Sequence, residues 1–118
     1  MSALKLYVVD NDEDDREVFR EVLTELACDM HLYSSGEALL DQLSRESRSD
    51  EYRLFILDMN MAALNGVDIT KRLRAFPNLH GCPVIVLSTS GEPRDRATCY
   101  TAGASAYLIK PTLFSEWQ

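Results

Sequence analysis

The chain has 118 residues, which suits one domain around a single core, and we expect one domain over residues 1–118. Its composition is that of a globular protein, and no apolar run reaches the ~20 residues of a membrane span. The net charge of −7 disfavours a nucleic-acid surface, because phosphate binding needs clustered Lys and Arg. The first residues lack the apolar core of a signal peptide, and we expect a cytoplasmic protein.

The first predicted element is a strand over residues 4–9, followed by a strongly acidic segment from Asp10 to Asp15. Apolar residues then recur at helical spacing from Val18 to Leu26, which predicts an amphipathic helix. The N-terminus of a helix favours negative charge, so capping explains the later acids without any function. Asp10 is different, because it directly follows the residues of the strand.

The next segments give weaker signals. Residues 30–33 form a short strand candidate, and a turn over 34–37 leads into a helix whose leucines lie at 39, 40 and 43. Residues 44–53 are polar and charged, which predicts a solvated loop before the following strand.

The central predicted strand consists of four large apolar residues, 54–57, followed by Asp58. Such a run favours a strand that is buried on both faces of a parallel sheet. Asp58 then lies at the carboxyl end of the strand, where open α/β sheets bind their ligands. A carboxylate in this place is a reactive group, a metal ligand, or a cap for the next helix.

Two further helices follow this strand. Each is marked by apolar residues at helical spacing, in one helix Ile69, Leu73 and Phe76, and in the other Ala97, Tyr100 and Ala104. Pro77 and Asn78 close the first of these helices. Pro93 suits the first turn of the second, and Gly103 helps to end it.

The last two strands complete an alternating pattern. Residues 83–87 form a continuous apolar strand that ends at Ser88, and residues 106–109 form a fifth strand that ends at Lys110. Strands and helices therefore alternate throughout. This alternation predicts an α/β fold with a parallel sheet, right-handed crossovers and helices on both faces.

Four strand ends bring chemically suitable side chains to one edge of this sheet, namely Asp10 with Asn11, Asp58, Ser88 and Lys110. Carboxylate and amide oxygens are the ligands that Mg²⁺ selects, and a carboxylate can also carry a phosphoryl group. A hydroxyl can donate a hydrogen bond to phosphoryl oxygens, and an ammonium can neutralise their charge. The alternative is an inert fold in which Lys110 forms an ion pair with Asp58.

The chain resembles the receiver domain of two-component response regulators. The segments that carry the resemblance are Val8 to Asn11, Ile56 to Met61, Val86 to Thr89 and Tyr107 to Pro111. The match covers about residues 4–111. It implies a flavodoxin-like, doubly wound sheet of five parallel strands in the order 2-1-3-4-5.

The resemblance also implies a function in a phosphorelay. Asp58 would accept a phosphoryl group from a sensor histidine kinase or a histidine phosphotransfer protein. Mg²⁺ would be held by Asp58, the backbone carbonyl of Asn60, and the corner formed by Asp10 and Asn11. The protein would not be an enzyme beyond its own phosphorylation and dephosphorylation, and its downstream protein partner is not indicated.

The resemblance further implies a conformational switch. Ser88 and Lys110 would hold the phosphoryl group, Ser88 would move toward it, and Tyr107 would turn inward. These movements would alter the surface of the fourth helix and the fifth strand.

Three features depart from the family pattern. Asn11 stands where a second acid is usual, so Mg²⁺ affinity is reduced unless Asp12 replaces that acid. Ala62 replaces the usual proline after the phosphoacceptor. Residues 112–118 leave only a short remnant of a fifth helix. Because this remnant covers its side of the sheet incompletely, either the natural chain continues beyond Gln118 or another subunit covers the gap. We expect the second, a homodimer formed through the fourth helix, the fifth strand and the apolar tail residues Leu113, Phe114 and Trp117.

Two other functions remain open at this stage. Asp10 and Asp12 match the DxD motif of haloacid-dehalogenase-like phosphatases, as nucleophile and general acid. The late metal-binding acids of that family are missing, since only Glu116 follows Lys110. The other possibility is a pseudo-receiver that binds partners without phosphorylation, which Asn11 makes credible.

Overall fold

The computed structural model describes residues 4–24, 28–46, 52–61, 63–76, 79, 81–89 and 91–110. Strands and helices alternate along these residues as β1 (Leu4–Val9), α1 (Glu13–Leu23), β2 (Cys28–Tyr33), α2 (Gly36–Arg45), β3 (Arg53–Asp58), α3 (Gly66–Ala75), β4 (Val84–Ser88), α4 (Pro93–Ala102) and β5 (Ala106–Ile109). The strands form one parallel sheet in the order β2-β1-β3-β4-β5. The predicted fold class and strand order are therefore confirmed.

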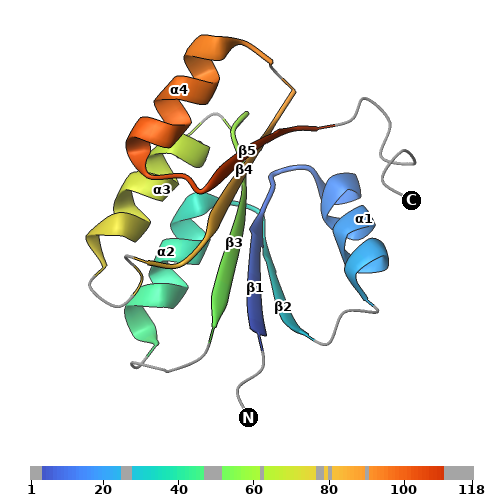
Figure 1. Ribbon diagram of the computed structural model, residues 1–118. Coiled ribbons are helices and arrows are strands. Elements are labelled where there is room, and N and C mark those ends of the chain that lie inside the picture. The colour runs from blue at the N-terminus through green and yellow to red at the C-terminus, as the bar shows by residue number, and fades with distance from the viewer. Residues whose placement is uncertain are drawn as a thin grey trace.

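The sheet lies between two layers of helices (Figure 1), with α2, α3 and α4 on one face and α1 on the other. Alternate residues of each strand face opposite layers, so Tyr7 and Val9 pack with α2 and α3, whereas Leu6 and Val8 pack with Phe19 of α1. The apolar runs of β1, β3 and β4 are thus buried from both sides. This double burial is the reason that their sequences do not alternate.

The register of the sheet aligns the carboxyl ends of its strands. Val9 pairs with Leu57, which places the next residues of β1 and β3 side by side. Three backbone hydrogen bonds continue beyond the strands, from Asp10 N to Tyr33 O at 3.0 Å, from Met59 N to Leu87 O at 2.8 Å, and from Lys110 N to Ser88 O at 2.6 Å. These bonds fix the strand ends relative to one another, and so position the side chains at this edge.

The start of α3 excludes a capping role for Asp58. Asn65 caps this helix by accepting a hydrogen bond from Asp68 N at 3.0 Å, and Asp68 accepts one from Asn65 N at 3.3 Å in return. Phe76, predicted as a helical residue, is the C-cap of α3 instead. Pro77 and Asn78, predicted to close the helix, lie outside the described residues.

The residues expected to share one face of α4, which are Ala97, Tyr100 and Ala104, do not mark the buried face of this helix. Cys99 and Ala102 are its buried residues, whereas Ala97 is exposed and Tyr100 exposes 44% of its surface. Gly103 ends the helix with a φ of 110°, a conformation that favours glycine, so the helix stops before Ala104. Small residues at helical spacing occur on more than one face of this helix, so spacing alone does not identify Cys99 and Ala102 as the buried residues.

The strand β5 carries two exposed apolar residues, which face opposite sides of the sheet. Leu108 and Ile109 of β5 expose 50% and 53% of their surfaces. Leu26 and the tail over 111–118, including Leu113, Phe114 and Trp117, lie outside the described residues. The fifth-helix remnant and the homodimer therefore stay predictions. No helix in the described part of the chain is long and apolar enough to cross a membrane.

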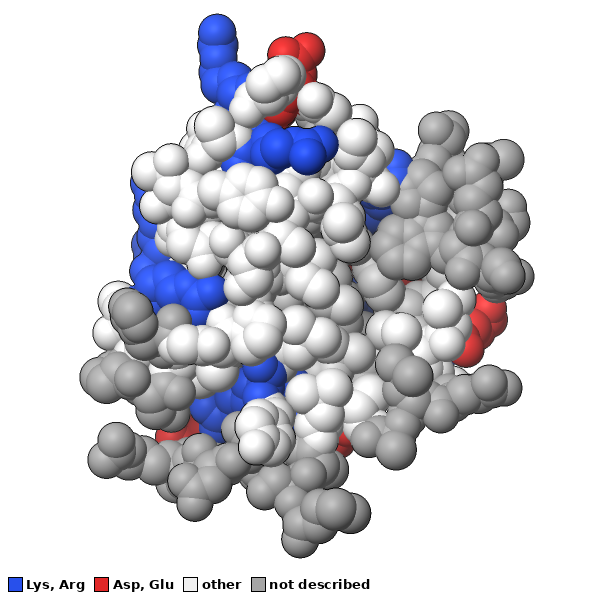
Figure 2. Space-filling model, viewed as in Figure 1, with Lys and Arg blue, Asp and Glu red and all other residues white. Residues whose placement is uncertain are grey.

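The face of the molecule in Figure 2 shows mainly Lys and Arg among its charged side chains, gathered over α3 and α4. The helices supply Lys71, Arg72, Arg74, Arg94 and Arg96. The first turn of α1 carries three consecutive acids instead, over residues 13–15. Negative charge therefore gathers at the end of α1 that lies next to the aligned strand ends.

Candidate functional site

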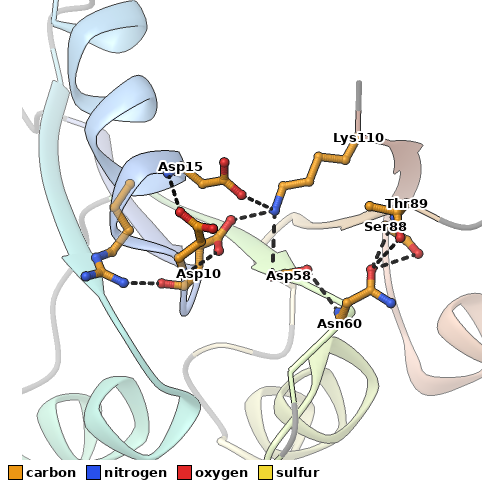
Figure 3. A network of polar contacts seen from close by, with 9 residues as sticks. Asp10, Asp15, Asp58, Asn60, Ser88, Thr89 and Lys110 are labelled. Atoms are coloured by element: carbon orange, nitrogen blue, oxygen red, sulfur yellow. Dashed lines mark hydrogen bonds and ion pairs between the residues drawn. The ribbon is translucent and has the colours of Figure 1, made fainter. Parts of the chain in front are cut away.

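Of the five side chains predicted for the sheet edge, four come together in the structure (Figure 3), whereas Asn11 is exposed. Asp10 follows β1, Asp58 ends β3, Ser88 ends β4 and Lys110 follows β5. Asp10, Asp58 and Ser88 are buried, and the Lys110 side chain is only 9% exposed. Buried polar groups at the carboxyl ends of parallel strands mark this edge as the candidate site.

Lys110 stands among three carboxylates. Its Nζ atom lies 2.7 Å from Oδ2 of Asp10, 2.8 Å from Oδ2 of Asp15 and 3.7 Å from Oδ2 of Asp58. A simple ion pair between Lys110 and Asp58, the alternative drawn from the sequence, therefore does not describe the contacts of this lysine. Of these three carboxylates, Asp10 and Asp15 lie within hydrogen-bond distance of the ammonium and Asp58 lies further away.

The pKa values of Asp10 and Lys110 are both raised. Burial raises the pKa of Asp10, although hydrogen bonds from Lys110 and the Asp12 backbone act in the opposite sense. Burial acts to lower the pKa of Lys110, but its hydrogen bonds to Asp10 and Asp15 outweigh this and raise the pKa above its usual value. Lys110 is thus firmly positively charged.

Local turns orient the two buried carboxylates. Oδ1 of Asp10 accepts a hydrogen bond from Asp12 N at 3.0 Å, and Oδ1 of Asp58 accepts one from Asn60 N at 2.9 Å. Each acid thus binds the backbone two residues further on, a conformation that Asp adopts readily after a strand. In both residues the other oxygen faces Lys110.

The Asn60 side chain connects the loop after β3 with the end of β4. Its Oδ1 atom accepts hydrogen bonds from Ser88 Oγ at 3.4 Å, Thr89 N at 3.2 Å and Thr89 Oγ1 at 3.3 Å. The sequence indicated only a role for the backbone carbonyl of Asn60. The side chain of Asn60 has a further role, because it accepts a hydrogen bond from the Ser88 hydroxyl.

The donor chemistry of this edge fits Mg²⁺ through the buried carboxylates of Asp10 and Asp58, which are hard oxygen ligands. Asn11 and Asp12 are exposed, and Oδ1 of Asp12 caps α1 by accepting a hydrogen bond from Asp15 N at 3.1 Å. Within the described ranges, three or more His, Cys, Asp or Glu side chains do not converge as a ready metal site. Lys110 instead holds an oxygen of Asp10.

Tyr107 is buried, at 4% exposure, and the guanidinium carbon of Arg96 lies 5.4 Å from the centre of its ring. Its backbone N–H donates to the hydroxyl of Tyr100 at 3.2 Å. The structure thus shows Tyr107 in an inward position, and the movement predicted for it stays a prediction.

Three residues near the site were not predicted to act there. Asp15 binds Lys110, Thr89 binds Asn60, and Arg16 donates a hydrogen bond to the backbone carbonyl of Asp10 at 2.7 Å. From the sequence, capping of the first helix was a sufficient explanation for Asp15. The contact with Lys110 shows that capping is only part of its role. Local spacing carries no signal for a contact with a lysine at the far end of the chain.

Comparison with known proteins identifies the family. The family model described as the response regulator receiver domain matches residues 6–117, and the chain belongs to this family. The chemotaxis protein CheY homolog of Campylobacter jejuni is 30% identical over 109 residues, which are 92% of this chain and 82% of that protein.

Other relatives are longer or more distant. The sensory/regulatory protein RpfC of Xanthomonas campestris is 31% identical over 116 residues, and this chain spans only 15% of its length. The phosphorylated cyanobacterial phytochrome response regulator RcpA has a similar fold, with a TM-score of 0.84 at 22% identity, covering 98% of this chain and 86% of that one. Vibrio cholerae chemotaxis protein CheY4 gives a TM-score of 0.83, also at 22% identity, over 98% of this chain and 93% of its own.

Family membership makes the chain a receiver domain of two-component signalling, a class of signalling domain rather than of enzyme. The phosphatase alternative is not favoured. That alternative needs Asp12 as a free general acid, whereas Asp12 caps α1. The chemistry of the edge is therefore best considered as that of a receiver.

Proposed function

We propose that Asp58 accepts a phosphoryl group from a histidine kinase or a histidine phosphotransfer protein. The observation that carries this proposal is the setting of its carboxylate. Asp58 is buried at the end of the central strand, and one oxygen is held by Asn60 N. The other oxygen faces a charged lysine, Lys110, at 3.7 Å.

In the proposed transfer, a carboxylate oxygen of Asp58 forms a bond to phosphorus while the bond from phosphorus to the donor nitrogen breaks. The electron pair of the broken bond stays on the imidazole nitrogen. Positioning and charge compensation carry most of the catalysis in such reactions. Asp58 contributes a carboxylate that is fixed before the donor arrives.

Asp10, Asn11, Asp58 and the backbone carbonyl of Asn60 would hold Mg²⁺ in this function. The metal, when bound, offsets negative charge on the phosphoryl oxygens. Asp10 and Asp58 supply the charged ligands, and Asn11 supplies a neutral one. Asp12 serves this corner only by giving up its hydrogen bond to the start of α1.

After transfer, Ser88 donates a hydrogen bond to the phosphoryl group and Lys110 neutralises its charge. Ser88 leaves Asn60 to do so, which shifts the end of β4. Because Tyr107 of the adjacent strand is already buried, phosphorylation stabilises its inward position rather than creating it. The surface of α4 and β5 is the part of the molecule that reports the change.

Labelling with acetyl phosphate tests this function. The unsubstituted protein is expected to take up one hydroxylamine-sensitive phosphoryl group in the presence of Mg²⁺, and Asp58→Asn is expected to take up none. Asp14→Asn is the matched control, because it removes an exposed acid from the first turn of α1, and it is expected to be labelled. Labelling of Asp58→Asn would move the nucleophile to Asp10, and failure to label any variant would favour a pseudo-receiver.

A further inference from the structure

Asp15 makes a contact that its position in the sequence does not explain. It is the third residue of α1, and its carboxylate points away from the helix end toward Lys110 (Figure 3). The distance from Oδ2 of Asp15 to Nζ of Lys110 is 2.8 Å, and the Asp15 side chain is 23% exposed. A residue of the first helix thus binds the lysine that follows the last strand.

Another aspartate, Asp68, shows how an acid at the third position of a helix behaves when it only caps that helix. Asp68 is the third residue of α3, and it accepts a hydrogen bond from the backbone N–H of the N-cap residue, Asn65. At α1, the backbone N–H of the N-cap residue Asp12 donates to Asp10 instead. The Asp15 carboxylate is therefore available for Lys110.

The contact competes with the proposed chemistry. An ammonium has three N–H donors, and Asp10 and Asp15 both lie within hydrogen-bond distance of Nζ of Lys110. Asp58 lies further away, at 3.7 Å. A phosphoryl group on Asp58 adds oxygens and negative charge on that side, and attracts Lys110 away from α1.

We propose that Asp15 is a positioning residue, which holds Lys110 against α1 in the resting protein and competes for it with the phosphoryl group on Asp58. The proposal rests on the proposed function of Asp58. Its consequence is regulatory, because phosphorylation releases the first turn of α1 from the end of β5. The strength of the contact between Asp15 and Lys110 then sets how strongly the site favours its phosphorylated state.

The affinity for beryllofluoride, a mimic of the phosphoryl group, measures this competition. Calorimetric titration at saturating Mg²⁺ is expected to show about threefold to tenfold tighter binding for Asp15→Asn than for the unsubstituted protein. Asp14→Asn is the matched control, since it removes the same charge from the same turn at an exposed position, and its affinity is expected to stay unchanged. Asp15→Glu restores the carboxylate and is expected to return the affinity toward the original value.

A second readout follows Lys110 without any ligand. The ¹⁵N-detected NMR signal of its ammonium is expected to shift and to exchange faster with water in Asp15→Asn, and to stay in place in Asp14→Asn. If the unsubstituted protein binds beryllofluoride but both Asn variants behave alike in titration and spectrum, the competition is wrong and the proposed function stands. If the unsubstituted protein binds no beryllofluoride, the proposed function is overturned, and the competition with it.

Discussion

The two ends of β3 each bury a charged residue, but they are built differently. At its start, Arg53 is paired with Glu46 at 3.4 Å, and Glu46 also accepts hydrogen bonds from the Tyr7 hydroxyl at 2.8 and 3.1 Å. At its end, Asp58 shares a single lysine with two other carboxylates, those of Asp10 and Asp15 (Figure 3).

The difference lies in the balance of charge. At the start of β3 the charges of Arg53 and Lys5 both lie near Glu46, at 3.4 and 3.8 Å, so negative charge is not in excess there. Three carboxylates around one ammonium repel one another, and this edge gains from binding a cation or from neutralising an acid. The charged groups at the start of β3 therefore stabilise the fold, whereas the excess of carboxylates at its end favours the binding of a cation. Replacing the acid at the start of β3, Glu46, is expected to lower stability, and replacing the acid at its end, Asp58, is expected to raise it.

The largest effect is expected at the structural end. Glu46→Gln leaves Arg53 without its charged partner in a buried place, and is expected to lower the free energy of unfolding by about 2 kcal/mol. Asp41→Asn is the matched control, because Asp41 pairs with Arg45 on the surface, and its loss is expected to cost under about 1 kcal/mol. Urea unfolding measures both values, and equal losses would remove the distinction between the two ends.

A smaller effect of opposite sign is expected at the other end. Asp58→Asn relieves repulsion among the three carboxylates while Asn can still accept the hydrogen bond from Asn60 N. We expect it to raise the free energy of unfolding by about 1 kcal/mol in the absence of Mg²⁺. A decrease in urea unfolding experiments would show that Asp58 contributes to stability in the way that Glu46 does.

The smallest effect concerns the metal corner. Asn11→Asp adds a further acid to the end that already has an excess, and is expected to tighten Mg²⁺ binding about threefold. Fluorescence titration with Mg²⁺ measures the affinity. Identical affinities in the two proteins would mean that Asp12 or another group already supplies the missing acid.

The strands and the place of the main site were predictable because they rest on local signals. Short uninterrupted apolar runs between turn residues favour buried strands of a parallel sheet, and the ends of such strands meet at one edge. Asp10, Asp58, Ser88 and Lys110 therefore come together as expected. The weak second strand was located with less accuracy, since the pattern placed it at 30–33 and the structure extends β2 back to Cys28.

Other features depend on contacts that spacing does not encode. An acid in the first turn of a helix has a sufficient local explanation, so nothing in the sequence pointed from Asp15 to Lys110. The side chain of Asn60 had no predicted partner for a similar reason, because its contacts come from the next strand end. The buried face of α4 was missed because its small residues, Ala97 and Ala102 among them, are nearly equivalent by pattern.

The central claim is that the end of β3 with excess negative charge carries the phosphoryl group on Asp58. Borohydride reduces an aspartyl phosphate to homoserine, which marks the modified residue permanently. Protein treated with acetyl phosphate and Mg²⁺, reduced, digested and analysed by peptide mass spectrometry is expected to contain homoserine in place of Asp58 alone. Homoserine at Asp10 or Asp12, with Asp58 unchanged, would contradict the account.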